Sequence, residues 1–121
     1  MTPRRGDIWW VRQSSSAQAS DASKKRRPYV VVSGDPWNLE PRYPRITLCP
    51  LTGLENVKRA YDTDVVLRAR DTRLPKDSVV RCVEIYTVFR SVLLERITRL
   101  SDPRLRDIER ALRLYLSLGA S

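Results

Sequence analysis

The chain contains no histidine, and this absence limits the chemistry that its 121 residues can perform. Histidine is the commonest general base near neutral pH and the commonest protein ligand of zinc. Nucleophile pairs of the serine–histidine or cysteine–histidine kind are therefore excluded. The acidic residues are dispersed along the chain, and their spacing nominates no carboxylate pair for metal binding. We expect any active site here to work without imidazole, without a metal and without another cofactor.

Three other scarcities narrow the class of protein. Only two cysteines are present, Cys49 and Cys82, which is too few for a disulfide framework and predicts buried, reduced thiols. The four glycines are too scattered to form a P-loop or a dinucleotide-binding fingerprint. No apolar run approaches the roughly 20 residues of a bilayer span, and the N-terminus lacks the apolar stretch of a signal peptide. We expect one cytoplasmic domain, residues 1–121, with no membrane contact.

Positive charge is abundant: 23 basic residues face 14 acidic ones, for a formal net charge of +9. Such a charge attracts polyanions through counterion release and electrostatic steering. Most of the excess is arginine, whose planar fork matches phosphate better than the point charge of lysine. The basic run from Lys24 to Arg27 ends a Ser/Ala-rich segment, residues 13–26, which we expect to be a long loop. The charge pattern predicts a nucleic-acid partner.

The hydrophobic pattern predicts strands followed by one late helix. Ser101 and Pro103 mark the start of that helix, and apolar residues recur at helical spacing from Leu105 to Leu116. This amphipathic helix is expected to lie on a sheet or on a partner, and to end at Gly119. The predicted strands are 7–11, 28–33, 45–51, 64–67, 78–88 (long and central) and 93–100. The order favours an antiparallel α+β domain.

Two polar residues at strand ends are candidates for chemistry. Arg27 lies where the basic loop enters the strand that Pro28 begins, so its backbone should be held firmly. A positioned arginine can donate two parallel hydrogen bonds to a phosphate. Thr52 ends the strand that begins at Arg45, beside Gly53, where its hydroxyl either caps the turn or faces a ligand.

Aromatic residues offer a further possibility. Two interpretations fit these side chains: they form a platform that stacks on nucleic-acid bases, or they belong to the buried core. The residues concerned are Trp9, Trp10, Trp37, Tyr29 and Tyr43. Trp9 and Trp10 are adjacent in a predicted strand and must face opposite sides, so at least one of them should be partly exposed or at an interface.

Five segments along almost the whole chain resemble, in order, the MazF/PemK (Kid) toxins of toxin–antitoxin systems. The first two match the family's opening R-G-D-[IVL]-[WY] and its R-P-x-[VL]-[VI]-[IV] strand, and the third ends in its P-[LI]-T. The fourth matches K-D-S-x-[VIL], and the fifth is the terminal helix. The segments are Arg5 to Trp9, Arg27 to Ser33 (with Asn38 following), Ile46 to Gly53, Lys76 to Val80 and Arg99 to Leu118.

The resemblance implies a small, strongly bent, SH3-like antiparallel barrel with a C-terminal helix. It also implies a homodimer that binds single-stranded RNA along its interface. The implied activity is metal-independent, sequence-specific cleavage of RNA, mostly messenger RNA, to 2′,3′-cyclic phosphate and 5′-hydroxyl ends. A cognate antitoxin with an acidic, disordered tail would compete with RNA for the basic groove and fold as it binds.

The same resemblance assigns roles to individual residues. The family's catalytic arginine and threonine align with Arg27 and Thr52, the two residues that the strand pattern also nominates. The further RNA-binding residues expected are Ser23, Lys24, Lys25, Arg26, Asn38, Arg81 and Glu84.

This sequence departs from the family pattern in two places. The usual G-S-E-Q of the first loop is replaced by the segment 20–23. The usual Q-[IV]-[RK]-[ST] becomes Glu84-Ile85-Tyr86-Thr87. Arg81 is expected on the same strand as Glu84, with its side chain on the opposite face. Glu84 beside RNA would repel phosphate, but its carboxylate can accept a hydrogen bond from a cytosine amine.

Two other functions fit the same sequence. One is a non-catalytic toxin of the same fold that inhibits DNA gyrase. The other is a basic RNA- or DNA-binding module without catalytic activity, which would show steeply salt-dependent binding and no cleavage.

Overall fold

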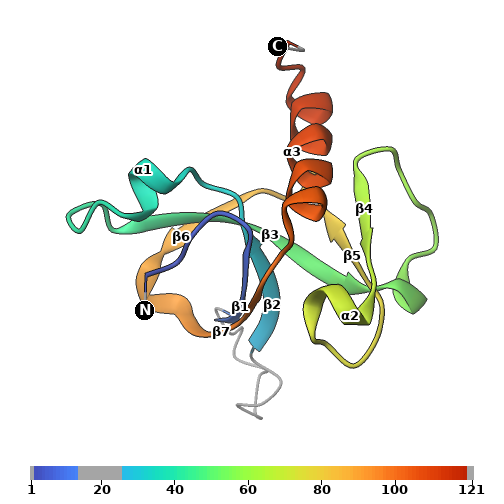
Figure 1. Cartoon of the computed structure of the whole chain (residues 1–121), viewed down its shortest axis with the longest axis horizontal. Helices are drawn as coiled ribbons and strands as arrows, with labels where there is room; N and C mark the ends of the chain where they lie inside the picture. The colour runs from blue at the N-terminus through green and yellow to red at the C-terminus, as the bar shows by residue number, and fades with distance from the viewer. Residues whose placement is uncertain (1, 14–25, 120–121) are drawn as a thin grey trace.

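The computed structural model describes residues 2–13 and 26–119, which form an antiparallel sheet and a C-terminal helix (Figure 1). The predicted loop at 13–26 lies outside the described residues except at its two ends. The strands are β1 Asp7–Arg12, β2 Arg26–Val31, β3 Arg45–Gly53, β4 Asp64–Leu67, β5 Ser78–Arg81, β6 Tyr86–Phe89 and β7 Leu93–Arg99. The helices are α1 Asp35–Asn38, α2 Ala69–Thr72 and α3 Asp102–Leu116, with 3-10 turns η2 Leu54–Asn56 and η3 Arg90–Val92.

The long strand β3 organises the sheet. The strand order is β4-β5-β3-β2-β1-β7, and β6 also pairs with β3. Every pairing is antiparallel. In Figure 1, β3 crosses the molecule from the α1 side to the β4–β5 side, with β6 along its first half and β5 along its second. The predicted class, an antiparallel α+β domain with a C-terminal helix, is confirmed.

The predicted single strand over 78–88 is wrong, because the chain bends in its middle. Between the pairs Leu51–Val80 and Leu48–Tyr86, β3 advances three residues while the opposite segment advances six. The extra residues form a turn in which the Glu84 amide donates to the Arg81 carbonyl at 3.0 Å. Arg81 and Glu84 therefore do not share a strand: Arg81 ends β5, and Glu84 lies in the turn before β6. Such insertions bend a sheet and redirect side chains.

Each side of the sheet has its own hydrophobic cluster. Directly paired residues share a face, so Ile8 and Val30 lie on one side while Trp9 and Tyr29 lie on the other. The first cluster includes Cys49 and Cys82, and α3 covers it with Ile108 and Ala111. The second comprises Trp9, Val11, Tyr29, Val31, Ile46 and Leu48. Trp9 is 6% exposed and Trp10 is half-buried, so the prediction that one of them is partly exposed is confirmed.

The two cysteines are buried and free, as predicted. Burial raises the pKa of the Cys49 and Cys82 thiols to about 12, because a thiolate in this apolar surrounding would lose its hydration. Both thiols are therefore protonated at neutral pH, and they act as core residues and not as nucleophiles.

The entry into β1 requires glycine. Gly6 has a φ of +92°, and a Cβ built on it would lie 3.2 Å from the Leu105 side chain of α3. Its amide donates to the Val31 carbonyl, and its carbonyl accepts from the Leu100 amide, both at 2.9 Å. Gly6 thus joins β2 to the segment leading into α3. Within the described residues, no helix combines the length and the apolar character needed to cross a membrane.

Candidate functional site

The structure brings together Arg27 and Thr52, which lie 25 positions apart in the sequence. The register of β2 on β3 pairs Tyr29 with Pro50, and continuing it by two residues sets Arg27 opposite Thr52. The Arg27 Nη2 atom donates to Thr52 Oγ1 at 2.5 Å. Its Nε atom donates to the Leu51 carbonyl at 3.3 Å. Two strands of the sheet therefore hold the guanidinium and the hydroxyl against each other.

The charge of Arg27 is not neutralised by these contacts. Both acceptors are neutral oxygens, and the guanidinium is half-buried with five N–H donors in total. Donors that these two bonds leave over can bind an anion. Because Thr52 accepts through its oxygen, its own hydroxyl proton remains available for the same anion. The pair can therefore bind a phosphate from two directions.

Aromatic residues extend the site on the same face. The Arg27 guanidinium carbon lies 5.8 Å from the centre of the Tyr29 ring, and that ring lies 6.4 Å from the ring of Tyr86. The Tyr86 hydroxyl donates to Glu84 Oε1 at 3.2 Å. This hydrogen bond and the charge of Glu84 raise the pKa of Tyr86, so its hydroxyl keeps its proton at neutral pH. Tyr86 was not among the site residues predicted from the sequence, although Glu84-Ile85-Tyr86-Thr87 departs there from the family pattern.

The remaining predicted RNA-binding residues separate into four groups. Ser23, Lys24 and Lys25 lie outside the described residues. Arg26 is exposed, with its guanidinium carbon 4.3 Å from the centre of the Trp10 ring, but alternation along β2 puts it on the opposite face from Arg27. Glu84 is near the Arg27 site through Tyr86.

Arg81 and Asn38 bind other parts of the protein. Arg81 Nη1 forms an ion pair with Asp64 Oδ2 at 3.0 Å, with side-chain exposures of 19% and 2%. Asn38 is 1% exposed, and its amide nitrogen donates to the Ser33 carbonyl at 2.8 Å and to Asp35 Oδ1 at 3.2 Å. Arg81 links β5 to β4, and Asn38 fixes α1. Neither residue is placed with Arg27 and Thr52.

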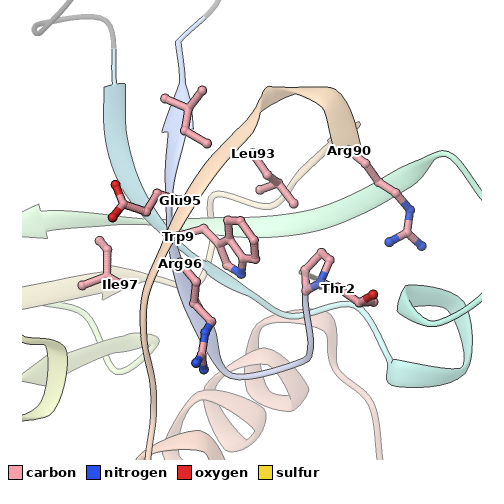
Figure 2. Close-up of a pocket in the computed structure, with 9 residues that line it drawn as sticks. Thr2, Trp9, Arg90, Leu93, Glu95, Arg96 and Ile97 are labelled. Carbon is pink, nitrogen blue, oxygen red and sulfur yellow. The ribbon is translucent and has the colours of Figure 1, made fainter.

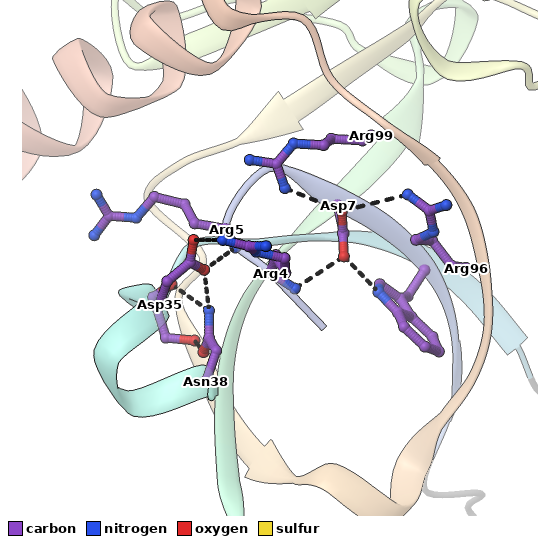
Figure 3. A network of polar contacts seen from close by, with 9 residues as sticks. Arg4, Arg5, Asp7, Asp35, Asn38, Arg96 and Arg99 are labelled. Atoms are coloured by element: carbon purple, nitrogen blue, oxygen red, sulfur yellow. Dashed lines mark hydrogen bonds and ion pairs between the residues drawn. The ribbon is translucent and has the colours of Figure 1, made fainter. Parts of the chain in front are cut away.

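The opening Arg4–Asp7 segment forms an arginine–carboxylate network (Figure 3). The buried Asp7 accepts from the Arg4 amide at 2.8 Å and forms ion pairs with Arg99 at 3.4 Å and Arg96 at 3.8 Å. Asp35 accepts from the Arg5 amide at 2.8 Å. Partial burial opposes the ionised form of Asp35, but this bond, the Asn38 amide and the Arg4 charge outweigh it and lower its pKa. The network joins β1, β7 and α1, so the Arg5-Gly6-Asp7 motif has a structural role here.

A cavity of about 650 Å³ lies between the N-terminal segment and β7 (Figure 2), and neither Arg27 nor Thr52 lines it. Trp9, Leu93, Arg90 and Arg96 line it. Arg90 donates to the Trp37 carbonyl of α1 and to the Tyr43 carbonyl of the α1–β3 loop, and Arg96 pairs with Asp7. Both arginines are therefore engaged by the protein. Within the described ranges, no three Cys, Asp or Glu side chains gather as a metal site would.

Comparison with known proteins identifies the family. Residues 4–116 match the family described as PemK-like, MazF-like toxin of type II toxin-antitoxin system. Endoribonuclease MazF2 of Mycobacterium bovis and endoribonuclease MazF6 of Mycobacterium tuberculosis are each 30% identical over 118 residues, covering 98% of this chain and all of theirs. A solved mycobacterial endoribonuclease, in complex with its cognate antitoxin, has the same fold with a TM-score of 0.74 and 19% identity, covering 98% of this chain and 99% of that one. The chain belongs to the PemK/MazF-like toxin family.

The buried ion pair yields a stability prediction. Arg81→Ala should lower the free energy of unfolding by about 3 kcal/mol, because it leaves the buried Asp64 carboxylate without its cation. Arg68→Ala is the matched control, since its ion pair with Asp77 is exposed and its loss should lower the free energy of unfolding far less. Urea unfolding measures both variants. Equal stabilities would show that the Arg81–Asp64 pair does not hold β5 on β4.

Proposed function

We propose that this chain is a sequence-specific endoribonuclease that cleaves single-stranded RNA, chiefly messenger RNA in the cytoplasm. Its family membership and its two endoribonuclease relatives support this function. The observation that carries the proposal is the contact between Arg27 and Thr52, because it joins an uncompensated cation to a free hydroxyl proton. We further propose that the bent sheet closes as an SH3-like barrel and that the whole chain acts as one domain.

The proposed reaction takes its nucleophile from the substrate. The 2′-hydroxyl of RNA attacks the adjacent phosphorus, the bond to the 5′-oxygen breaks, and the products are a 2′,3′-cyclic phosphate and a 5′-hydroxyl. The protein must align these atoms and stabilise the charge that develops at phosphorus. A histidine-free chain can do both without a nucleophile of its own, and the reaction as proposed needs no metal.

Arg27 and Thr52 have distinct roles in this scheme. The Thr52 hydroxyl donates to a non-bridging phosphate oxygen, and Arg27 stabilises the additional negative charge of the transition state. An arginine side chain stays protonated in proteins and is a poor general base, so the first role of Arg27 is electrostatic. Donation of a proton to the leaving 5′-oxygen is its second proposed role. The net charge of +9 attracts RNA to the surface.

The cleavage prediction concerns three variants. Purified protein should cleave long RNA in the presence of EDTA, leaving 5′-hydroxyl ends that need phosphorylation before ligation. Arg27→Ala and Thr52→Val should each lower kcat by about 100-fold, because each removes a donor aimed at the reacting phosphate. Arg42→Ala removes the same charge from an arginine whose side chain is 95% exposed, and it should cleave at the wild-type rate.

Three results would contradict the proposal. Cleavage by Arg27→Ala at the wild-type rate would show that Arg27 does not stabilise the transition state. Toxicity that survives Arg27→Ala and Thr52→Ala together, with gyrase inhibited, would identify the gyrase-inhibiting alternative. Salt-sensitive binding of RNA or DNA without cleavage would identify a simple binding module.

The end of α3 supports the proposed homodimer. Ile108 and Ala111 pack into the core, but the last turn extends past the sheet and leaves apolar side chains about half-exposed (Figure 1). A cleft of about 350 Å³ beside it is lined in part by Thr47, Ile85 and Leu116. The exposed apolar residues are Leu114, Tyr115, Leu116 and Leu118. We propose that a second copy covers this surface.

Light scattering on the purified protein tests the dimer. The wild type should have twice the mass of the chain, and Leu116→Glu should shift it toward the single-chain mass, since a buried carboxylate without a partner opposes association. Val66→Glu, which alters a 38%-exposed residue on β4, should leave the dimer intact. A wild type with the mass of one chain would overturn the proposal.

We also propose a cognate antitoxin whose acidic, disordered tail occupies the basic groove and competes with RNA. The mycobacterial endoribonuclease of the same fold was solved with its cognate antitoxin. Charge complementarity to Arg27 and to the net charge of +9 supports this partner. An acidic peptide should inhibit cleavage at low salt and lose this effect as salt rises. Cleavage unchanged by the peptide at low salt would count against the competition.

A further inference from the structure

Tyr86 presents an aromatic ring beside the Arg27–Thr52 pair. It begins β6 and is 45% exposed. The register pairs Tyr86 with Leu48 and Tyr29 with Pro50, so these four residues share one face of the sheet. Arg27 and Thr52 lie on the same face, two residues beyond Tyr29 and Pro50 on β2 and β3 respectively. Four residues of β3, about 13 Å, separate Thr52 from the partner of Tyr86. A nucleotide next to a phosphate bound at Thr52 can span this distance.

Two contacts restrain the exposed Tyr86 ring. Tyr29, which is only 8% exposed, packs against Tyr86 with the two rings inclined at 78°. The Tyr29 hydroxyl donates to Gln13 Oε1 at 3.2 Å, which fixes Tyr29 in turn. The Tyr86 hydroxyl donates to Glu84. A tyrosine has only two side-chain torsions, so a ring restrained in this way can bind a ligand at little entropic cost.

The Glu84 carboxylate and the Arg27 guanidinium carry opposite charges and must therefore bind different groups of an RNA ligand. Glu84 repels phosphate, yet the Tyr86 hydroxyl holds it close to a phosphate-binding site. An ionised carboxylate only accepts hydrogen bonds and has about four lone-pair sites, of which Tyr86 uses one. The groups of RNA that donate are the 2′-hydroxyl and the amino and imino groups of the bases. Guanine offers N1–H and an adjacent amino group, which a carboxylate can accept together, whereas uracil offers one N–H between two carbonyls.

We propose that Tyr86 stacks on the nucleobase next to the scissile phosphate and that Glu84, oriented by the Tyr86 hydroxyl, selects a base with an amino group. Guanine fits best and uracil fits worst. This inference rests on the proposed function, because the Arg27–Thr52 pair positions the phosphate. It adds two features to that function: a stacking residue and a chemical rule for the adjoining base.

Cleavage-site sequencing and binding test the inference together. Long RNA is digested by the wild type and by Tyr86→Ala, Tyr86→Phe and Glu84→Gln, and the bases flanking each cut are counted. The binding probe is the most frequently cut sequence, as an oligonucleotide with a 2′-deoxy substitution that blocks cleavage. Tyr86→Ala should weaken binding about tenfold, since stacking on an aromatic side chain is lost. Tyr61→Ala is the control, because Tyr61 is 53% exposed with Arg59 5.3 Å from its ring centre, yet lies on the loop before β4.

The conservative variants separate the two roles. Tyr86→Phe keeps the ring and should bind nearly as tightly as the wild type, but with a weaker base preference because Glu84 is no longer held. Glu84→Gln should still cleave and should admit uracil at the flanking position, since an amide both donates and accepts. Thermal unfolding followed by circular dichroism shows whether each variant is folded. If Tyr86→Ala is not, Tyr86→Leu, which keeps an apolar side chain but has no ring, tests the stacking in its place.

The possible outcomes distinguish this inference from the proposed function. Wild-type base preference in folded Tyr86→Phe and Glu84→Gln would overturn the selection rule while leaving ribonuclease activity in place. Wild-type affinity in folded Tyr86→Ala would overturn the stacking. If the wild type cuts no RNA, the proposed function fails, and the binding comparison, made on a single-stranded oligonucleotide that contains all four bases, still decides whether Tyr86 stacks.

Discussion

The antiparallel register between β2 and β3 is the constraint on which the site depends. It sets Arg27 opposite Thr52, and a slip of one residue would turn Arg27 to the other face of the sheet. Burial holds the register in place: Val30 and Val31 point to opposite faces, and both are fully buried. Because each face has its own core, any slip would expose apolar side chains on both sides. The burial that stabilises the fold therefore also fixes the geometry of the Arg27–Thr52 site.

The arginines of this chain serve different purposes according to their partners. Arg5, Arg96 and Arg99 bind carboxylates that join β1, β7 and α3, and Arg81 binds the buried Asp64. These arginines hold the structure together. Arg27 instead contacts two neutral oxygens, so its charge stays available for an incoming phosphate. This division explains how a strongly basic chain can contain one arginine suited to chemistry, with no histidine to assist it.

The sequence predicted local features better than long-range ones. The alternation of apolar residues predicted the antiparallel sheet, and their helical repeat predicted α3. The positions of Arg27 and Thr52 at strand ends made them candidates for the site. All of these features depend on residues that are neighbours in the sequence. The bend between β5 and β6 was missed because it follows from the shifted pairing with β3, a strand distant in the sequence. Asn38 was expected to bind RNA, but its amide is satisfied within the α1 loop. Local alternation carries no information about such contacts.

A double-mutant cycle on RNA cleavage tests the central claim, that Arg27 and Thr52 form one phosphate-binding unit. The cycle compares single-turnover rates of the wild type, Arg27→Ala, Thr52→Val and the double variant on one RNA. Groups that act as a unit are strongly non-additive, so the double variant should be about as slow as the slower single variant. Rate losses that multiply in the double variant would show that the two residues act independently, which would contradict this account.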